Sequence, residues 1–181
     1  MYSCDSLMSF LAIDPGNEES ALIELDDELR PLWSLKTNNA AAREKILRAR
    51  LRESPASHLV IEMIASYGMP VGREVFETCL WIGRFIECWC GPYTLVYRRE
   101  VKSFLCADSR AKDSNVRQAV IDRYGGKEAA IGKKKTPGPL YALTGDLWQA
   151  LAVGVTWSCT RRGQHPRSEH DGDGPCAGCA A

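Results

Sequence analysis

Three acidic residues stand at points where the sequence predicts that a buried element ends or begins. Asp14 closes the apolar run 6–14, Glu62 is the only charged residue in the apolar segment 58–64, and Asp146 precedes an apolar stretch. A buried carboxylate has to be paired, protonated or bound to a metal ion. Three carboxylates brought together are suitable oxygen ligands for Mg²⁺ or Mn²⁺. Two such ions can promote phosphodiester hydrolysis.

Five predicted strands and four predicted helices position these acids. The strands are 6–14, 21–25, 29–35, 58–64 and 93–101, and the helices are 38–52, 71–90, 113–124 and about 144–159. The acidic turn Asp26-Asp27-Glu28 predicts a hairpin, and Pro31 suits an edge strand. This order predicts an α/β fold in which a mixed five-stranded sheet, with three antiparallel strands and then two parallel strands, is flanked by helices.

Two segments are predicted to lie outside the sheet and helices. Residues 127–139 are rich in Gly, Lys and Pro and predict a mobile basic loop. From residue 161 onward apolar residues almost vanish, which predicts one folded domain at 1–160 followed by a flexible tail at 161–181. The tail also holds Cys176 and Cys179, whose spacing is compatible with zinc, although the apolar-poor surroundings favour a plain tail.

Length and composition exclude several classes of protein. A chain of 181 residues with 45% hydrophobic and 25% charged residues fits one globular domain. It is too short for the two domains of an actin-like or sugar-kinase ATPase, so we expect no nucleotide cofactor. The chain lacks an apolar run of roughly 18 residues, so we expect no membrane partner and a cytoplasmic location.

The charge is distributed unevenly although the formal net charge is zero. Residues 14–30 hold seven acidic side chains and one arginine, whereas residues 98–135 hold eleven basic and five acidic side chains. The first region would repel phosphates, and the second would attract them. This distribution is compatible with a nucleic-acid partner that the net charge alone does not indicate.

Four segments follow one another along the chain: AIDPG at 12–16, IE at 61–62, EVK at 100–102 with AKDSNV at 111–116, and GDLWQALA at 145–152. In this order they resemble the RuvC-like Holliday junction resolvases of the ribonuclease H superfamily. The first two segments are similar to the two catalytic strands of that family, the third to the stretch that carries two lysines, and the fourth to the final helix. The resemblance spans about residues 7–158, and YGMPVG at 67–72 with KDSN at 112–115 is similar to bacteriophage-encoded members.

This resemblance implies a ribonuclease H-like fold and a metal-dependent endonuclease that cleaves branched DNA such as Holliday or four-way junctions. It implies that Mg²⁺ or Mn²⁺, two ions per site, is held by Asp14, Glu62 and Asp146, with Lys102 and Lys112 near the cleaved phosphate. Neighbouring phosphates would be bound by Arg110, Lys133, Lys134 and Lys135. Symmetric cutting needs two sites, so a homodimer through the 71–90 helix is implied. A phage-encoded protein would act in the host cytoplasm.

The sequence departs from the family pattern at two positions. The second ligand of the final helix falls on Gln149, a neutral amide three residues after Asp146, which offers at most a carbonyl oxygen to a metal ion. The aromatic residue that follows the second acid falls on Ala65, and Tyr67 is a substitute that could stack on a base. Two alternatives therefore stay open: a catalytically weak protein that binds branched DNA, and a nuclease that acts on structured RNA.

Overall fold

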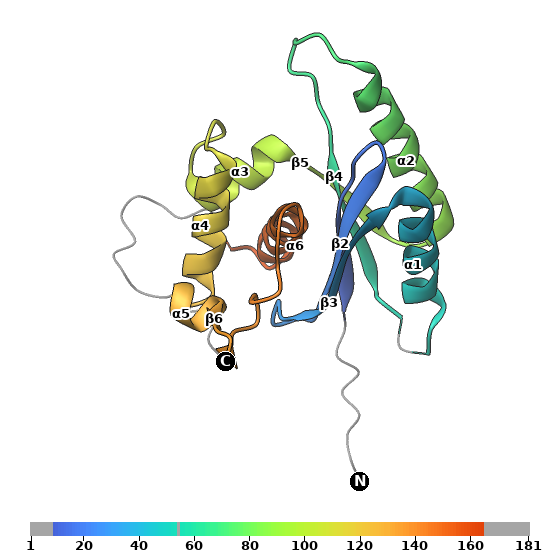
Figure 1. Cartoon of the computed structure of the whole chain (residues 1–181). Coiled ribbons are helices and arrows are strands. Elements are labelled where there is room, and N and C mark those ends of the chain that lie inside the picture. The colour runs from blue at the N-terminus through green and yellow to red at the C-terminus, as the bar shows by residue number, and fades with distance from the viewer. Residues whose placement is uncertain (1–8, 54, 165–181) are drawn as a thin grey trace.

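One mixed sheet forms the centre of the computed structural model, which describes residues 9–53 and 55–164 (Figure 1). Its strands are β1 (Phe10–Asp14), β2 (Glu19–Leu25), β3 (Pro31–Asn38), β4 (His58–Met63) and β5 (Tyr93–Tyr97). They lie in the order β3-β2-β1-β4-β5; β1, β2 and β3 pair antiparallel, and β1, β4 and β5 run parallel. The predicted mixed sheet is confirmed, and Pro31 lies on an edge strand as expected.

Helices cover both faces of this sheet in layers (Figure 1). On one face lie α1 (Asn39–Leu51) and α2 (Arg73–Trp89). On the other face α6 (Leu147–Arg161) packs against the sheet, and α3 (Arg98–Cys106) and α4 (Asp113–Arg123) pack over α6. In the described parts of the chain, no helix is both long enough and apolar enough to cross a membrane.

Strand β1 is rigidly held because it is buried on both faces. Phe10 and Ala12 belong to the apolar cluster around α6, whereas Leu11 and Ile13 belong to the cluster under α1 and α2. All four side chains are at most 2% exposed. Side chains alternate between faces along a strand, so Asp14 continues the series of Phe10 and Ala12 on the α6 side.

Helix α6 is buried around most of its circumference and lies close to the sheet. Gly154 makes this distance possible, because a Cβ atom there would come within 2.7 Å of Leu25 Cδ1 and 3.1 Å of Ala12 Cβ. A larger residue would push α6 away from β1. The position of Asp146 and Gln149 at the start of α6 therefore depends on a glycine two turns further along the helix.

The predicted strand 93–101 is wrong in its second half. Strand β5 ends at Tyr97, and α3 begins at Arg98. The Glu100 carboxylate accepts a hydrogen bond from the Tyr97 backbone N–H at 2.6 Å, which satisfies one of the free donors at the start of the helix. Val101 is buried because it lies on the inner face of α3. Its apolar side chain matches the alternating pattern of the predicted strand only by coincidence.

The predicted mobile loop 127–139 is also wrong, because this segment has regular structure. It contains the short helix α5 (Lys127–Ala130) and a hairpin of β6 (Gly132–Lys133) and β7 (Thr136–Pro137). Backbone hydrogen bonds from Gly138 to Ile131 and from Leu140 to Ala130, both 2.8 Å, close the segment. The buried side chains of Ala130 and Leu140 fix it to the core. Residues 165–181, which include Cys176 and Cys179, lie outside the described residues.

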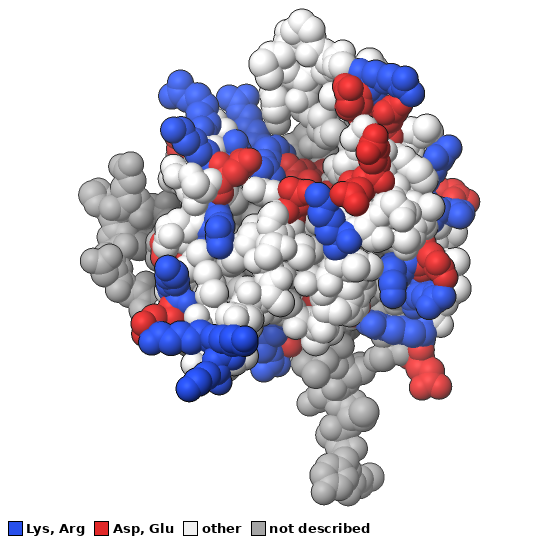
Figure 2. Space-filling model, viewed as in Figure 1, with Lys and Arg blue, Asp and Glu red and all other residues white. Residues whose placement is uncertain are grey.

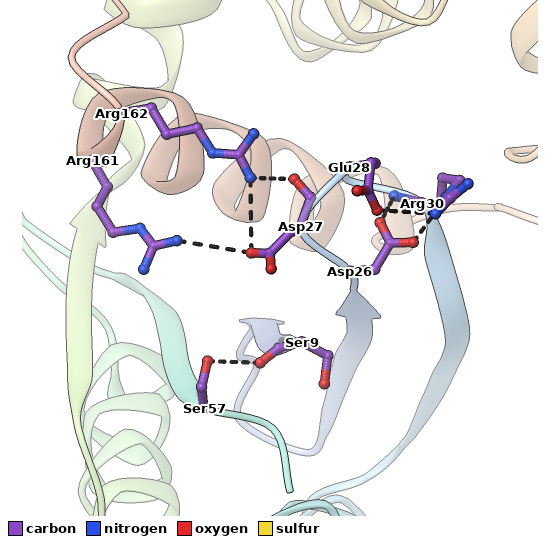
Figure 3. Close-up of polar contacts among 8 residues, drawn as sticks. All are labelled: Ser9, Asp26, Asp27, Glu28, Arg30, Ser57, Arg161 and Arg162. Carbon is purple, nitrogen blue, oxygen red and sulfur yellow. Dashed lines mark hydrogen bonds and ion pairs between the residues drawn. The ribbon is translucent and has the colours of Figure 1, made fainter. Parts of the chain in front are cut away.

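Polar contacts hold the ends of β1, β2 and α6 together at the end of the sheet opposite Asp14 (Figure 3). Arg161 and Arg162, at the end of α6, pair with Asp27 in the β2–β3 turn, and Arg162 also donates to the Asp27 carbonyl oxygen. Ser57 Oγ donates to the Ser9 carbonyl oxygen at 2.9 Å. These contacts involve exposed side chains, so their role is to fix the far end of α6 rather than to add much stability.

Candidate active site

The carboxyl ends of three neighbouring parallel strands bring Asp14, Glu62 and Arg98 together. Asp14 ends β1 and Glu62 is the penultimate residue of β4. The pairing of Ile13 with Ile61 in the residues just before them sets the two acids side by side, both on the α6 face. Arg98 follows β5 directly. Two carboxyl groups and one guanidinium therefore lie along the same end of the sheet.

Burial raises the pKa of both carboxyl groups in this pair. Removal from water raises the pKa of Asp14 to about 8, and the charge of Glu62 adds to the rise, whereas Arg98 opposes it. Glu62 is only 7% exposed, and burial likewise raises its pKa against the opposing effect of Arg98. Burial therefore favours the protonated form of both carboxyl groups when no cation lies between them.

Arg98 joins the acidic pair to the start of α4. Its Nη1 donates to Glu62 Oε2 at 3.1 Å and to Oε1 at 3.3 Å, and its Nη2 lies 2.8 Å from Asp113 Oδ1. Lys102 Nζ lies 3.5 Å from the same Asp113 oxygen. The side chains of Arg98 and Lys102 are 27% and 20% exposed, so both cations lie inside the rim of the site.

The start of α6 contributes Asp146 and Gln149. Asp146 occupies the N-cap position, yet its side chain makes no capping hydrogen bond, so a plain capping role does not explain this residue. Its carboxylate instead pairs with Lys36 of β3 at 2.8 Å, and Lys36 also lies 3.4 Å from Glu19. The charge of Asp146 also contributes to the raised pKa of Asp14, so the two acids lie close enough to interact.

The chemistry of these donors fits a hard divalent cation, although they are not gathered into a finished site. Asp14 and Glu62 offer adjacent carboxylates, and Gln149 Oε1 is a buried acceptor that has no hydrogen-bond partner among the described residues. Within residues 9–53 and 55–164, no three His, Cys, Asp or Glu side chains form a ready metal-binding group. Glu62 and Asp146 each contact a basic side chain, Arg98 and Lys36 respectively.

Of the two lysines predicted near the phosphate, the structure brings only Lys102 next to this network. Lys112 is exposed at the N-cap of α4, and in the described structure no ion pair joins it to an acid. Arg110 is exposed close by in the α3–α4 loop. Lys133, Lys134 and Lys135 are exposed on the β6–β7 hairpin, which follows the far end of α4 from Asp113. The hairpin therefore lies outside the site.

Tyr67 lies in the segment after β4, beside an open pocket of about 760 Å³. Its ring is 54% exposed, and the Arg99 guanidinium carbon lies 5.5 Å from the ring centroid. Tyr97, Glu100 and Ser103 line the same pocket. An exposed aromatic face beside a cation is suited to stacking on a nucleobase.

The surface around the site alternates in charge. Figure 2 shows acidic side chains in the upper centre of the face, at the carboxyl end of the parallel strands, with basic side chains beside them over α3 and α4. An acidic centre next to a basic surface suits a cation in the centre and a polyanion across both.

Three residues of the site were missed by sequence reasoning, namely Arg98, Lys36 and Asp113. Arg98 was hidden because the predicted strand 93–101 ran past it, so it was not expected at a strand end. Lys36 comes from the antiparallel half of the sheet, where only the register with Ala21 brings it toward the carboxyl end of β1. Asp113 was visible in KDSN, but no pattern indicated its pairing.

Comparison with solved structures places this architecture among known folds. RuvC from Thermus thermophilus superposes with a TM-score of 0.62 and 16% sequence identity, covering 88% of this chain and 99% of that chain. T. thermophilus RuvC in complex with a Holliday junction substrate gives a TM-score of 0.61 and 18% identity, covering 88% of this chain and 98% of that chain. No family model matches the sequence, and no curated protein matches it. The chain therefore has a RuvC-like fold, consistent with a ribonuclease H-like architecture.

Proposed function

We propose that the protein is a metal-dependent endonuclease that cleaves branched DNA, with a four-way junction as its main substrate. The observation that carries this proposal is the adjacency of Asp14 and Glu62 at the carboxyl ends of β1 and β4, on the face that α6 covers. The matching fold of RuvC, one structure of which holds a Holliday junction substrate, supports branched DNA as the substrate class.

Four side chains would hold the metal: Asp14, Glu62, Asp146 and the amide oxygen of Gln149. When bound, a divalent ion would supply charge neutralisation at the phosphate and activation of a water molecule. Asp14 has to give up the proton that its raised pKa favours, so binding of a cation and ionisation of this group are linked. Asp146 has to exchange Lys36 for the cation.

Two lysines would contact the scissile phosphate or the DNA backbone next to it. Lys102 lies 3.5 Å from Asp113 on the rim of the carboxylate cluster, where a phosphate oxygen could replace the Asp113 oxygen as its partner. Lys112 is exposed one residue before Asp113, so it can approach the backbone from solvent. Their proposed roles are to offset charge at the phosphate and to position the strand.

The wider basic surface would hold the arms of the substrate. Arg110 is exposed in the α3–α4 loop, and Lys133, Lys134 and Lys135 extend the surface past the far end of α4. Contacts of this kind give affinity that depends on salt and hardly on sequence. Tyr67 would stack on an unpaired base next to the junction centre, with Arg99 supporting its ring.

A homodimer through α2 would supply the two sites that a symmetric junction requires. Phe76 and Leu80 are 65% and 56% exposed and lie one turn apart on the solvent side of α2. Gly83 continues this side, and nothing lies within 4 Å of where its Cβ would stand. An apolar stripe with a glycine allows two copies of the helix to approach closely about a two-fold axis.

One observation favours a second candidate function. Gln149 brings no negative charge, so the metal site holds less charge than one with a carboxylate there. A protein of this kind would bind branched DNA and cleave it poorly or not at all. A nuclease that acts on structured RNA would use the same site chemistry, so structured RNA is one of the substrates to be compared.

Cleavage of a synthetic four-way DNA junction tests the proposed function. The wild type and Glu62→Gln are compared in Mg²⁺ and in Mn²⁺, with linear duplex and structured RNA of equal length as further substrates. Glu53→Gln is the matched control, because it makes the same chemical change at an exposed residue after the C-terminus of α1. We expect paired nicks in the junction from the wild type and from Glu53→Gln, and a loss of at least about 100-fold in Glu62→Gln.

Other outcomes separate the alternatives. Tight junction binding by both the wild type and Glu62→Gln, with no cleavage in either metal, would favour the binding protein. Faster cleavage of structured RNA than of the DNA junction would favour the RNA nuclease. Equal cleavage by the wild type and Glu62→Gln would remove Glu62 from the site and contradict the proposed mechanism.

A further inference from the structure

Arg98 lies within the candidate site but has no role in the binding of metal or DNA proposed above. It follows β5 in the place where β1 and β4 present their acids, so the three neighbouring parallel strands end in two acids and one guanidinium. Placing a cation beside buried acids is costly unless it is paired, and Arg98 is paired on both sides, with Glu62 at 3.1 Å and Asp113 at 2.8 Å. The structure therefore holds a fixed positive charge inside the acidic site.

The balance of charge limits how many metal ions this site can hold. Asp14, Glu62 and Asp146 carry three negative charges when all are ionised, and Gln149 adds none. Arg98, Lys36 and Lys102 carry three positive charges, and the acids that pair with them outside this set, Asp113 and Glu19, add two negative charges. The sum of the network is then −2, so one divalent ion would bring it to neutral, whereas two would leave a positive excess of two before substrate binds. Like charges confined at short range repel strongly when partly buried.

The guanidinium also keeps donors free for a substrate. Arginine has five N–H donors in a planar fork, and among the described residues Arg98 uses its two terminal nitrogens, toward Glu62 and Asp113. Its side chain is 27% exposed, so part of it faces the solvent from which a phosphate would approach. A lysine in this place would have three N–H donors and no planar fork, so pairing with both acids would leave it at most one donor for a phosphate.

From these contacts we infer that Arg98 is a resident cation of the active site that takes the place of a second metal ion, so that each chain works with one divalent ion. Arg98 holds Glu62 in position and, when DNA is bound, donates to a non-bridging oxygen of the scissile phosphate. This role deepens the proposed nuclease function and rests on it. It replaces the two ions per site that the family resemblance implies with one ion and one arginine.

Counting bound ions tests this role without relying on activity. The full chain is titrated with Mn²⁺, and bound ion is measured by electron paramagnetic resonance and by isothermal titration calorimetry. Ions that Asp14→Asn still binds are subtracted, because they lie outside the site. We expect one site-specific Mn²⁺ per wild-type chain, one in Arg98→Lys, which keeps the charge, and a second ion or at least about tenfold tighter binding in Arg98→Gln.

Cleavage of the four-way junction gives the second measurement. We expect Arg98→Gln to cut at least about 100-fold more slowly at saturating metal, as when one donor to a transition state is removed, and Arg98→Lys to recover part of the loss. A thermal unfolding curve for each variant identifies a change that only destabilises the fold.

The results separate failure of this role from failure of the nuclease. Two site-specific ions of similar affinity in the wild type would overturn the role of Arg98, even if junctions are cleaved and even if every variant unfolds. An unchanged ion count and unchanged cleavage in Arg98→Gln would do the same. A third outcome is one bound ion in the wild type, a second ion or tighter ion binding in Arg98→Gln, and no cleavage of any substrate. It would support the proposed charge role of Arg98 and contradict the proposed nuclease function.

Discussion

Lys36 of β3 and Asp146 before α6 form an ion pair with 2.8 Å between Nζ and Oδ2, which links the antiparallel half of the sheet to the helix that carries the third acid of the site. Both side chains are about half exposed, at 44% and 51%. An exposed pair contributes little to folding, so its main effect is on where the Asp146 carboxylate points.

Replacing Lys36 should therefore strengthen metal binding. In Lys36→Gln the Asp146 carboxylate loses its basic partner, and we expect Mn²⁺ to bind about fivefold more tightly, which corresponds to about 1 kcal/mol at a partly exposed site. The free energy of unfolding in urea should change by less than about 0.5 kcal/mol. Lys45→Gln, an exposed lysine on α1, is the control. Unchanged metal binding in Lys36→Gln would show that Asp146 does not contribute to the site.

The raised pKa of Asp14 predicts how stability depends on pH in the absence of metal. The folded state holds this proton up to about pH 8, whereas the unfolded chain releases it near pH 3.8. Between these values the unfolded state binds fewer protons, so the free energy of unfolding falls as pH rises, by at most about 1.4 kcal/mol per pH unit. Below pH 3.8 both states are protonated and the group has no effect.

Asp14→Asn removes this dependence, because an amide does not ionise. In EDTA at pH 8 we expect the variant to be more stable than the wild type by about 2 kcal/mol, measured by urea unfolding, while its junction cleavage is lost. At pH 4 the two proteins should differ much less. A variant that is less stable than the wild type at pH 8 would show that the Asp14 carboxylate is not strained in the metal-free fold.

The sequence was sufficient to predict the strand ends that carry Asp14 and Glu62, because an apolar run with one acid at or near its end has few structural explanations. It was not sufficient for Arg98, since apolar alternation does not mark the residue at which a strand passes into a helix. Here that boundary depends on the hydrogen bond from the Tyr97 backbone to Glu100. The predicted strand was four residues too long, so Arg98 was not expected at a strand end.

Pairing between distant segments is the other part that the sequence could not supply. Lys36 meets Asp146 only because β3 pairs with β2 in one register and α6 lies over the sheet at the distance that Gly154 permits. A shift of one residue would turn Lys36 to the other face. Alternating patterns predict which residues share a face, but they leave open which residue of another element each will contact.

Gln149 provides a direct test of how charge sets the number of metal ions. Its Oε1 is buried without a partner, and Gln149→Glu keeps the shape of the side chain while adding a negative charge. We expect the variant to bind a second Mn²⁺ and to cut the junction faster than the wild type. In EDTA it should be less stable, because another buried carboxylate joins Asp14 and Glu62. Unchanged ion binding would place Gln149 outside the site.

The exposed stripe of α2 predicts a dimer that a single charge would break. Leu80→Glu places a carboxylate in the middle of the stripe, and we expect a monomer in sedimentation velocity experiments at concentrations where the wild type is a dimer. The fold should survive, because Leu80 is already 56% exposed. Leu51→Glu on α1 makes the same change at a residue that is 72% exposed and should leave the dimer intact. A wild type that is monomeric when bound to a junction would contradict the α2 interface.

The lysines of the β6–β7 hairpin should contribute to DNA affinity through salt-dependent contacts alone. Replacing Lys133, Lys134 and Lys135 together with alanine removes three exposed charges that lie away from the carboxylates. If each contacts a phosphate, the slope of log affinity against log salt concentration for a DNA junction should fall by about 2 to 3. Cleavage at saturating DNA should change little, because the hairpin does not touch the site.

A matched triple variant on α1 distinguishes a specific path for DNA from a general loss of positive charge. Arg43, Lys45 and Arg48 are exposed on the face of the sheet opposite α6. Replacing them with alanine removes the same formal charge and should leave the salt slope within about 0.5 of the wild type. An equal fall of the salt slope in both triple variants would mean that these charges act on DNA from a distance. That result would contradict direct contact between the β6–β7 hairpin and a DNA arm.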